Sequence, residues 1–133
     1  MAKVWQKNMV FLDTNILLEI ILKDRAKKLQ VENFLKVVSE PSAISMLSVH
    51  LIMHFGRKEQ ANDEFLEGVI RENKLLTLIP EDYEWALVNE KKKDFEDALQ
   101  MAVAIRAGCE AFVTLDSDLA KAYAGLSIKI VTI

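Results

Sequence analysis

The apolar positions of the chain fall into short continuous runs that alternate with segments of helical spacing. Residues 9–12 form one run that ends abruptly at Asp13, and residues 111–115 form another that ends at Asp116. Short runs without an alternating polar face are typical of strands buried on both faces, as in parallel sheets. We therefore expect strands at both places.

Helical spacing marks most of the remaining chain. Residues 14–38 predict two helices, or one bent helix, which stop before Pro41 because the residue ahead of a proline disfavours helical backbone. The long apolar stretch 43–55 predicts a brief strand leading into a buried helix. Further elements are expected as helices over 65–70 (after Asn62), 82–92, 95–103 and 119–123, and as strands over 75–79 and 128–133.

The segment from Phe95 to Val103 carries the clearest helical pattern, with Gly108 as its stop signal. Strands and helices alternate along the chain, which contains no repeat, linker or low-complexity segment. We expect a single α/β domain over residues 1–133. Its three layers would be a mostly parallel sheet of four to five strands with helices on both faces, joined by right-handed crossovers.

Composition narrows the class of protein. The chain has 133 residues, 51% of them hydrophobic, which suffices for one core. Lys and Arg total 17 against 20 Asp and Glu, so a protein that coats nucleic acid is disfavoured while an enzyme that visits RNA briefly is allowed. Cys109 is the single cysteine, which excludes an intramolecular disulfide and favours a reducing compartment.

Residues 1–8 lack the layout of a signal peptide, and the apolar stretch over residues 9–22 is interrupted by polar side chains. We therefore expect a cytoplasmic protein with no membrane association.

Two aspartates stand at the ends of predicted strands. Ligands of open parallel sheets bind beyond the carboxyl ends of the strands, so Asp13 and Asp116 would meet there if their strands are neighbours. Like charges at close range favour binding of a hard cation. Taken singly, each aspartate is explained as well by capping of the helix that follows it.

A third acidic group, Asp94-Phe95-Glu96-Asp97, opens the helix over 95–103 and follows Lys91-Lys92-Lys93. The helix dipole favours negative charge there, and Asp94 is the expected cap. Asp97 lies on the same side of the helix as Asp94, away from the apolar stripe, and can project toward a shared site. The lysines either contact phosphates at the rim of that site or form a solvated helix end.

Three segments together resemble the PIN-domain family, including the prokaryotic VapC-type toxins: Val10-Phe11-Leu12-Asp13-Thr14-Asn15, Asp94-Phe95-Glu96-Asp97-Ala98-Leu99-Gln100 and Val113-Thr114-Leu115-Asp116. The resemblance extends from Val10 nearly to the C-terminus. It implies a parallel sheet flanked by helices, with an acidic pocket that holds one or two divalent cations. The implied activity is that of an endoribonuclease, a phosphodiester hydrolase acting on single-stranded RNA.

The resemblance also implies roles for individual residues. Asp13, Asp97 and Asp116 would be catalytic and would hold Mg²⁺ or Mn²⁺, with Asn15, Asp94 and Asp118 in support. A metal-activated water then serves as nucleophile, and magnesium keeps several waters, so an incomplete set of protein ligands is expected. The toxin-type relatives further imply a homodimer and a small antitoxin that covers the site. Residues 46–55 are a candidate contact surface, although burial in the core explains their apolar character equally well.

The chain departs from the family pattern on the helix expected after the second strand. Many members carry a glutamate there, whereas residues 45–52 contain no acid, and His50 or Leu51 takes the place. His50 shares a helix face with His54, a spacing that can chelate a metal, although an ordinary surface histidine is the simpler interpretation. Glu19 either supplies a substitute carboxylate or marks the solvent-facing edge of its helix.

Two other function classes remain as alternatives. The first is a non-catalytic RNA-binding or scaffold domain that keeps the fold. The second is phosphoryl transfer through an aspartyl intermediate, as in haloacid-dehalogenase-like phosphatases, against which the absence of a second acid at residue 15 weighs. Trp5 and Trp85 have the chemistry to stack on bases, but packing is the more ordinary role of an isolated tryptophan, and we assign neither to binding.

Overall fold

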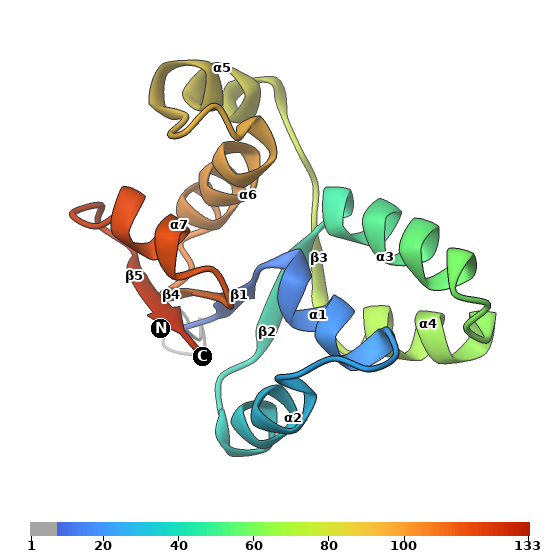
Figure 1. Cartoon of the computed structure of the whole chain (residues 1–133). Helices are drawn as coiled ribbons and strands as arrows, with labels where there is room; N and C mark the ends of the chain where they lie inside the picture. Colours follow the sequence, from blue (N-terminus) through green and yellow to red (C-terminus); the bar gives the residue numbers. More distant parts are fainter. Residues whose placement is uncertain (1–7) are drawn as a thin grey trace, which may run out of the picture.

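A five-stranded sheet forms the centre of the computed structural model, which describes residues 8–133 (Figure 1). Every neighbouring pair of strands is parallel, in the order β3-β2-β1-β4-β5. The expectations for the N-terminal segment and for Trp5 concern residues 1–7, which lie outside the described part. The strands are β1 (Val10–Leu12), β2 (Ser42–Ser45), β3 (Lys74–Leu76), β4 (Ala111–Thr114) and β5 (Lys129–Thr132).

Helices cover both faces of the sheet. Figure 1 shows α1 to α4 on one face and α5 to α7 on the other, with α5 packed on the outside of α6. This three-layer α/β arrangement confirms the predicted fold class. The helices are α1 (Thr14–Ile21), α2 (Lys28–Val37), α3 (Met46–Lys58), α4 (Asp63–Arg71), α5 (Pro80–Asn89), α6 (Phe95–Arg106) and α7 (Ser117–Ala122). Within the described residues, no helix has both the length and the apolar character needed to span a bilayer.

Successive residues of the central strands alternate between two cores. Leu12 and Val113 pack into the core beneath α1 to α4, whereas Phe11 and Phe112 pack into the core beneath α6 and α7. The two phenylalanine rings stack with their centroids 5.3 Å apart. Full burial of such side chains contributes about 1.5–3 kcal/mol each. Both cores therefore hold β1 against β4, and this places Asp13 and Asp116 at the same edge of the sheet.

The prediction that the helix within residues 43–55 is buried is wrong for most of α3. Only Ser48, Ile52 and Gly56 along one side of α3 are buried. A Cβ atom added to Gly56 would lie 2.6 Å from a methyl group of Leu66, so glycine is what allows α3 to approach α4 this closely. The opposite side of α3, which carries His50 and His54, faces solvent, and Phe55 beside the buried line is also exposed.

Two other expectations were wrong in detail. The strand predicted over 75–79 pairs only over Lys74–Leu76, because Pro80 is the first residue of α5 and residues 77–79 lead into that helix. Glu19 does not mark a solvent-facing edge: it is buried, and its carboxylate accepts a 2.7 Å hydrogen bond from the Lys27 amide at the start of α2. Glu19 therefore joins α1 to α2.

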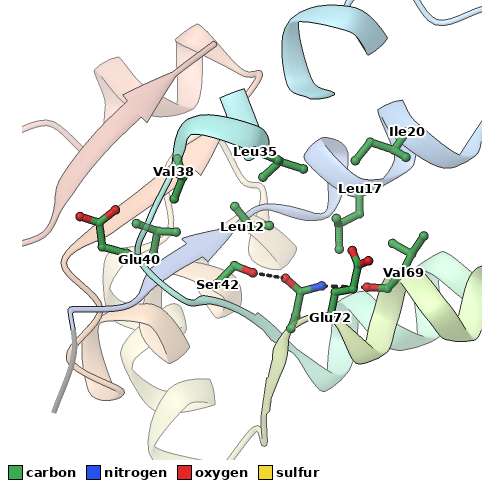
Figure 2. A pocket seen from close by; sticks show the side chains of 11 residues that line it. Leu12, Leu17, Ile20, Leu35, Val38, Glu40, Ser42, Val69 and Glu72 are labelled. Carbon is green, nitrogen blue, oxygen red and sulfur yellow. Dashed lines mark hydrogen bonds between the residues drawn. The ribbon is translucent and has the colours of Figure 1, made fainter. Parts of the chain in front are cut away.

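A cavity of about 190 Å³ lies between the sheet and the helices α1, α2 and α4 (Figure 2). Most of its lining side chains are apolar, with Leu17, Leu35 and Val69 among them, but Glu40 and Glu72 also line it. At its border Ser42 donates a 2.6 Å hydrogen bond to Asn73, whose side-chain amide donates to the Val69 carbonyl at 2.9 Å. None of the candidate aspartates lines this cavity, so it is separate from the acidic edge of the sheet.

Candidate active site

Asp13 follows β1 directly and occupies the N-cap position of α1, yet its side chain makes no capping hydrogen bond. Its Oδ2 instead accepts a 2.7 Å hydrogen bond from the hydroxyl of Thr114, at the end of β4. Only 5% of Asp13 is exposed. The capping interpretation therefore fails for Asp13, whose carboxylate is held by the neighbouring strand.

Thr114 is the centre of a small hydrogen-bond cluster that also contains Asn15. The Thr114 hydroxyl oxygen accepts from the Asn15 amide at 3.3 Å and from the Asp116 backbone amide at 3.0 Å. The Asn15 carbonyl accepts from the Leu115 backbone amide at 3.2 Å. Asn15 is thus linked to Asp13 through the Thr114 hydroxyl. The sequence-based interpretation missed Thr114, for which the available signal was a hydroxyl residue at the end of a buried strand.

Asp97 and Asp116 line one hollow of about 160 Å³, beside α6 and α7, together with Asp94 and Asp118. We call it the acidic hollow. Asp94 caps α6 as predicted, accepting from the Asp97 amide at 3.1 Å. Asp116 caps α7 through Oδ1, which accepts from the amides of Asp118 (2.9 Å) and Leu119 (3.1 Å). The other oxygen of Asp116, Oδ2, makes no hydrogen bond with the described residues, so capping leaves half of the carboxylate available.

The carboxylates repel one another across this edge of the sheet. Burial raises the pKa of Asp13 to about 6, with further increases from the charges of Glu96 and Asp116 and an opposing contribution from Thr114. Burial also raises the pKa of Asp97 to about 8, and the next largest cause is the charge of Asp13. Asp116 adds to the pKa increase of both. The three predicted aspartates therefore lie within electrostatic reach of one another, an arrangement that favours a bound cation.

Glu96 is a fourth acidic residue of this edge that the sequence-based interpretation did not single out. It is more exposed than Asp13 and Asp97, and burial of part of its side chain, followed by the charge of Asp94, raises its pKa. Its own charge acts on Asp13. The available signal was its place within the acidic segment 94–97, between two aspartates that were singled out.

A buried polar network lies next to Asp13 and joins three helices. The Gln100 side-chain amide donates to the hydroxyls of Thr14 (2.8 Å) and Ser48 (2.9 Å), and these two hydroxyls are themselves 2.6 Å apart. The hydroxyl of Ser45 donates to the Gln100 carbonyl at 2.6 Å. Gln100 interrupts the apolar face of α6, and the sequence-based interpretation missed its role. The network fixes the first turns of α1 and α3 relative to α6.

The position of the family glutamate on α3 holds no acid. Ser48 faces Thr14, and Leu51, three residues further along the same side of α3, is partly buried. His50 is exposed and its ring stacks on that of His54, with centroids 6.3 Å apart. Neither histidine lines the acidic hollow, and the Glu19 carboxylate is bound at the start of α2. Between residues 8 and 133, no three Asp, Glu, His or Cys side chains approach closely enough to enclose a metal ion by themselves.

The three lysines before α6 form a turn at the rim. Lys91 and Lys92 line the acidic hollow, and the Lys91 backbone amide donates to the hydroxyl of Tyr123 at 3.2 Å. Lys92 and Lys93 adopt positive φ angles of 55° and 56°, which are uncommon for residues other than glycine. This turn places two cationic side chains beside the carboxylates.

Comparisons with known proteins agree with this architecture. Residues 10–125 match the family model of the PIN domain. A toxin-antitoxin complex from Klebsiella pneumoniae has 21% sequence identity and a TM-score of 0.73, covering 92% of this chain and 96% of the other. VapC20 from Mycobacterium tuberculosis, a Sarcin-Ricin loop cleaving toxin, has 15% identity and a TM-score of 0.72, covering 86% and 95%. VapBC2 from Rickettsia felis, bound to a DNA fragment from its promoter, has 15% identity and a TM-score of 0.67, covering 92% and 98%.

Among curated proteins, none matches the chain significantly. The identities to the solved structures are low, so these likenesses concern the fold. The family model, in contrast, spans most of the sequence and includes all three acidic segments. The chain belongs to the PIN-domain family.

Proposed function

We propose that this protein is a divalent-metal-dependent ribonuclease that hydrolyses single-stranded RNA. The observation that carries the proposal is the state of Asp13: a buried carboxylate that caps no helix, is held by Thr114, and lies within electrostatic reach of Asp97 and Asp116. Membership of the PIN-domain family supports it. So does the fold shared with VapC20, which is described as cleaving the Sarcin-Ricin loop.

The donor set fits a hard divalent cation such as Mg²⁺ or Mn²⁺. Carboxylate oxygens are the ligands that these ions prefer, and the repulsion among the acids is relieved by a bound positive charge. We assign Asp13, Asp97 and Asp116 as its ligands, directly or through water. Water must complete the coordination, since the described side chains do not enclose an ion by themselves. When bound, the cation supplies activation of water and neutralisation of charge on the phosphate.

The residues around the three aspartates orient the Asp13 carboxylate and bind RNA phosphates and water. Thr114 orients the Asp13 carboxylate and opposes the effect of burial on its pKa. Lys91 and Lys92, at the rim of the acidic hollow, bind phosphates of the RNA strand and set its position without reading its sequence. Asp94 and Asp118 accept hydrogen bonds from water in the same hollow. No side chain is required as a nucleophile.

The test is cleavage of single-stranded RNA by the purified protein, with and without Mg²⁺ or Mn²⁺. We expect metal-dependent cleavage that is lost in Asp13→Asn, Asp97→Asn and Asp116→Asn. Asp63→Asn is the matched control, because Asp63 is exposed and paired with Arg57 far from the acidic hollow. Cleavage that survives chelation, or that persists in all three variants, would refute the proposed site.

Two substitutions of Asp116 distinguish its capping of α7 from a role in RNA cleavage. Asparagine is about as good an N-cap as aspartate, so Asp116→Asn keeps the cap of α7 and removes the charge. The melting temperature of this variant should be no lower than that of the wild type, since the cap is kept and a repelling charge is removed, while cleavage is lost. Asp116→Ala removes both the cap and the charge, and the loss of the cap should lower the free energy of unfolding by about 1 kcal/mol. Equal activity of Asp116→Asn and wild type would leave Asp116 with a capping role only.

A non-catalytic RNA-binding domain is the second candidate, and the absence of an acid on α3 favours it. At that end of α3, Ser48 presents a hydroxyl that is already bonded to Thr14 and Gln100. Such a domain would leave single-stranded RNA intact, and the wild type and the Asp13→Asn variant would bind that RNA equally well. Binding measured beside cleavage, on the same RNA, distinguishes the two candidates.

We also propose a small antitoxin as partner and a homodimer as the assembled state. The antitoxin is suggested by the toxin-antitoxin complexes that share the fold. Residues 46–55 are the candidate dimer surface, since two apolar side chains of this segment, Met46 (41%) and Phe55 (36%), are exposed. Light scattering of wild type and Phe55→Glu tests the dimer. Co-expression with the product of a short adjacent gene, followed by the cleavage assay, tests the antitoxin.

A further inference from the structure

A second hollow of about 180 Å³ adjoins the acidic hollow, between the end of α5 and the loop that follows α7. Lys91 and Tyr123 line both hollows. The other walls of the second hollow include Trp85, Asn89 and Leu126. We call it the aromatic hollow.

We propose that the aromatic hollow receives the nucleobase of a nucleotide next to the scissile phosphate. This inference rests on the proposed ribonuclease function and names the part of the RNA that the protein would read. Trp85 is partly exposed and supplies aromatic surface on which any base can stack, whereas Tyr123 is buried in the wall. The hollow is smaller than the roughly 300–1,000 Å³ of pockets for drug-sized ligands, so it suits a single ring system.

Asn89 gives the aromatic hollow a group able to distinguish bases. Its side-chain nitrogen donates a 2.9 Å hydrogen bond to the Trp85 carbonyl, which fixes the orientation of the amide. Its Oδ1 makes no hydrogen bond with the described residues and can accept from an amino or imino group of a base. Gly125 also lines the hollow, and an added Cβ atom there would meet nothing within 4 Å.

The two hollows follow the order of groups within a nucleotide. Lys91 lines both the hollow that contains Trp85 and the hollow that contains the carboxylates. Its backbone is fixed by the hydrogen bond to the Tyr123 hydroxyl. A base stacked near Trp85 would therefore place its phosphate over Lys91, next to Asp97 and Asp116. The sequence suggested only a packing role for Trp85; its ring packs against the core and also lines this hollow.

The test uses the fluorescence of Trp85. The chain contains two tryptophans, so Trp5→Phe leaves Trp85 as the single reporter. We expect the four ribonucleoside 5′-monophosphates to quench it saturably, with affinities that differ among the bases, and ribose 5-phosphate to leave it unchanged. Absence of saturable quenching, or equal quenching by ribose 5-phosphate, would overturn the proposal.

Two substitutions on α5 test the role of the Asn89 side-chain amide in base binding. Asn89→Ala should weaken mononucleotide binding about five-fold, as expected for one lost hydrogen bond, and should reduce the differences among bases. Val88→Ala is the matched control, since Val88 is 83% exposed and does not line the aromatic hollow. Equal affinities of the two variants would also contradict the proposal.

Failure of this inference can be told apart from failure of the ribonuclease proposal. Quenching needs no cleavage, so RNA cleavage by a protein whose Trp85 does not respond to mononucleotides contradicts the base-binding inference alone. Base-dependent quenching in a protein that never cleaves RNA contradicts the catalytic proposal alone.

Discussion

The hydroxyl of Thr114 donates a 2.7 Å hydrogen bond to the carboxylate of Asp13, across 101 positions of the sequence. The bond crosses from β4 to the end of β1 and is buried. It opposes the increase in the Asp13 pKa that burial causes. One hydroxyl therefore sets both the orientation and the charge of the most buried acid in the proposed site.

Thr114→Val should lower cleavage at neutral pH about ten-fold, the effect of losing one hydrogen bond to a charged group. Without that bond the pKa of Asp13 rises further, so the pH at which cleavage reaches half its maximum should also move upward. Thr114→Ser keeps the hydroxyl, so both the cleavage rate and the pH of half-maximal cleavage should return to the wild-type values. A pH profile of cleavage for the three proteins makes the measurement, and an unchanged profile in Thr114→Val would show that the bond has no such role.

The metal-free protein should lose stability as the pH rises. The folded-state pKa values of Asp13 and Asp97, about 6 and about 8, lie above the ordinary value of 3.8. The folded protein therefore binds more protons than the unfolded chain across this window, and raising the pH favours unfolding. We expect the free energy of unfolding to decrease by about 2–3 kcal/mol, mostly from Asp13, because solvent screens the partly exposed Asp97. Urea unfolding between pH 4 and pH 8 measures it, and Asp13→Asn should remove most of the change.

Millimolar Mg²⁺ or Mn²⁺ should raise the melting temperature more at pH 8 than at pH 5. Protons compete with the cation for the same carboxylates, and a ligand that binds only the folded state stabilises it. Asp97→Asn should reduce the metal effect, whereas Asp63→Asn should not. Differential scanning fluorimetry with and without the ion measures the shift. A shift of equal size in Asp13→Asn and wild type would place the ion elsewhere.

Glu96→Gln should weaken metal binding without abolishing cleavage. The charge of Glu96 acts on Asp13, but Glu96 is exposed and does not line the acidic hollow. We expect the metal concentration for half-maximal cleavage to increase about three-fold, the size of a partly screened charge interaction. A complete loss of cleavage would instead make Glu96 a direct ligand, in place of the glutamate absent from α3.

Gln100→Leu should reduce the free energy of unfolding by about 3 kcal/mol. The substitution removes the partner that the buried hydroxyls of Thr14, Ser45 and Ser48 share. Each hydroxyl keeps one contact within the network but loses a buried hydrogen bond to Gln100, and buried polar groups with unmet hydrogen bonds are unfavourable. Gln30→Ala is the control, because Gln30 is exposed on α2 and should change stability by less than about 0.5 kcal/mol. Urea denaturation compares the two. Equal stabilities would mean that water replaces the lost hydrogen bonds.

The sequence determined the order of the elements, because the pattern that predicts a buried strand or an amphipathic helix is local. The runs ending at Asp13 and Asp116 became the neighbouring strands β1 and β4, and the periodic stripe after Asp94 became α6. The acidic positions at the strand ends could likewise be read directly from the sequence. The exposure of α3 and the burial of Glu19 could not, since each depends on which helix packs beside it.

Only the tertiary structure decided which partner each polar side chain has. Asp13, Asp94 and Asp116 all occupy N-cap positions, so the local sequence predicts helix capping for each of them. Asp13 differs from the other two because its side chain contacts Thr114 on β4 and caps no helix. Gln100 and Trp85 belong to ordinary helical segments, and their surroundings come from residues far away in the chain. Burial, electrostatic repulsion and hydrogen bonding depend on distances in space, which sequence spacing specifies only within a single helix or strand.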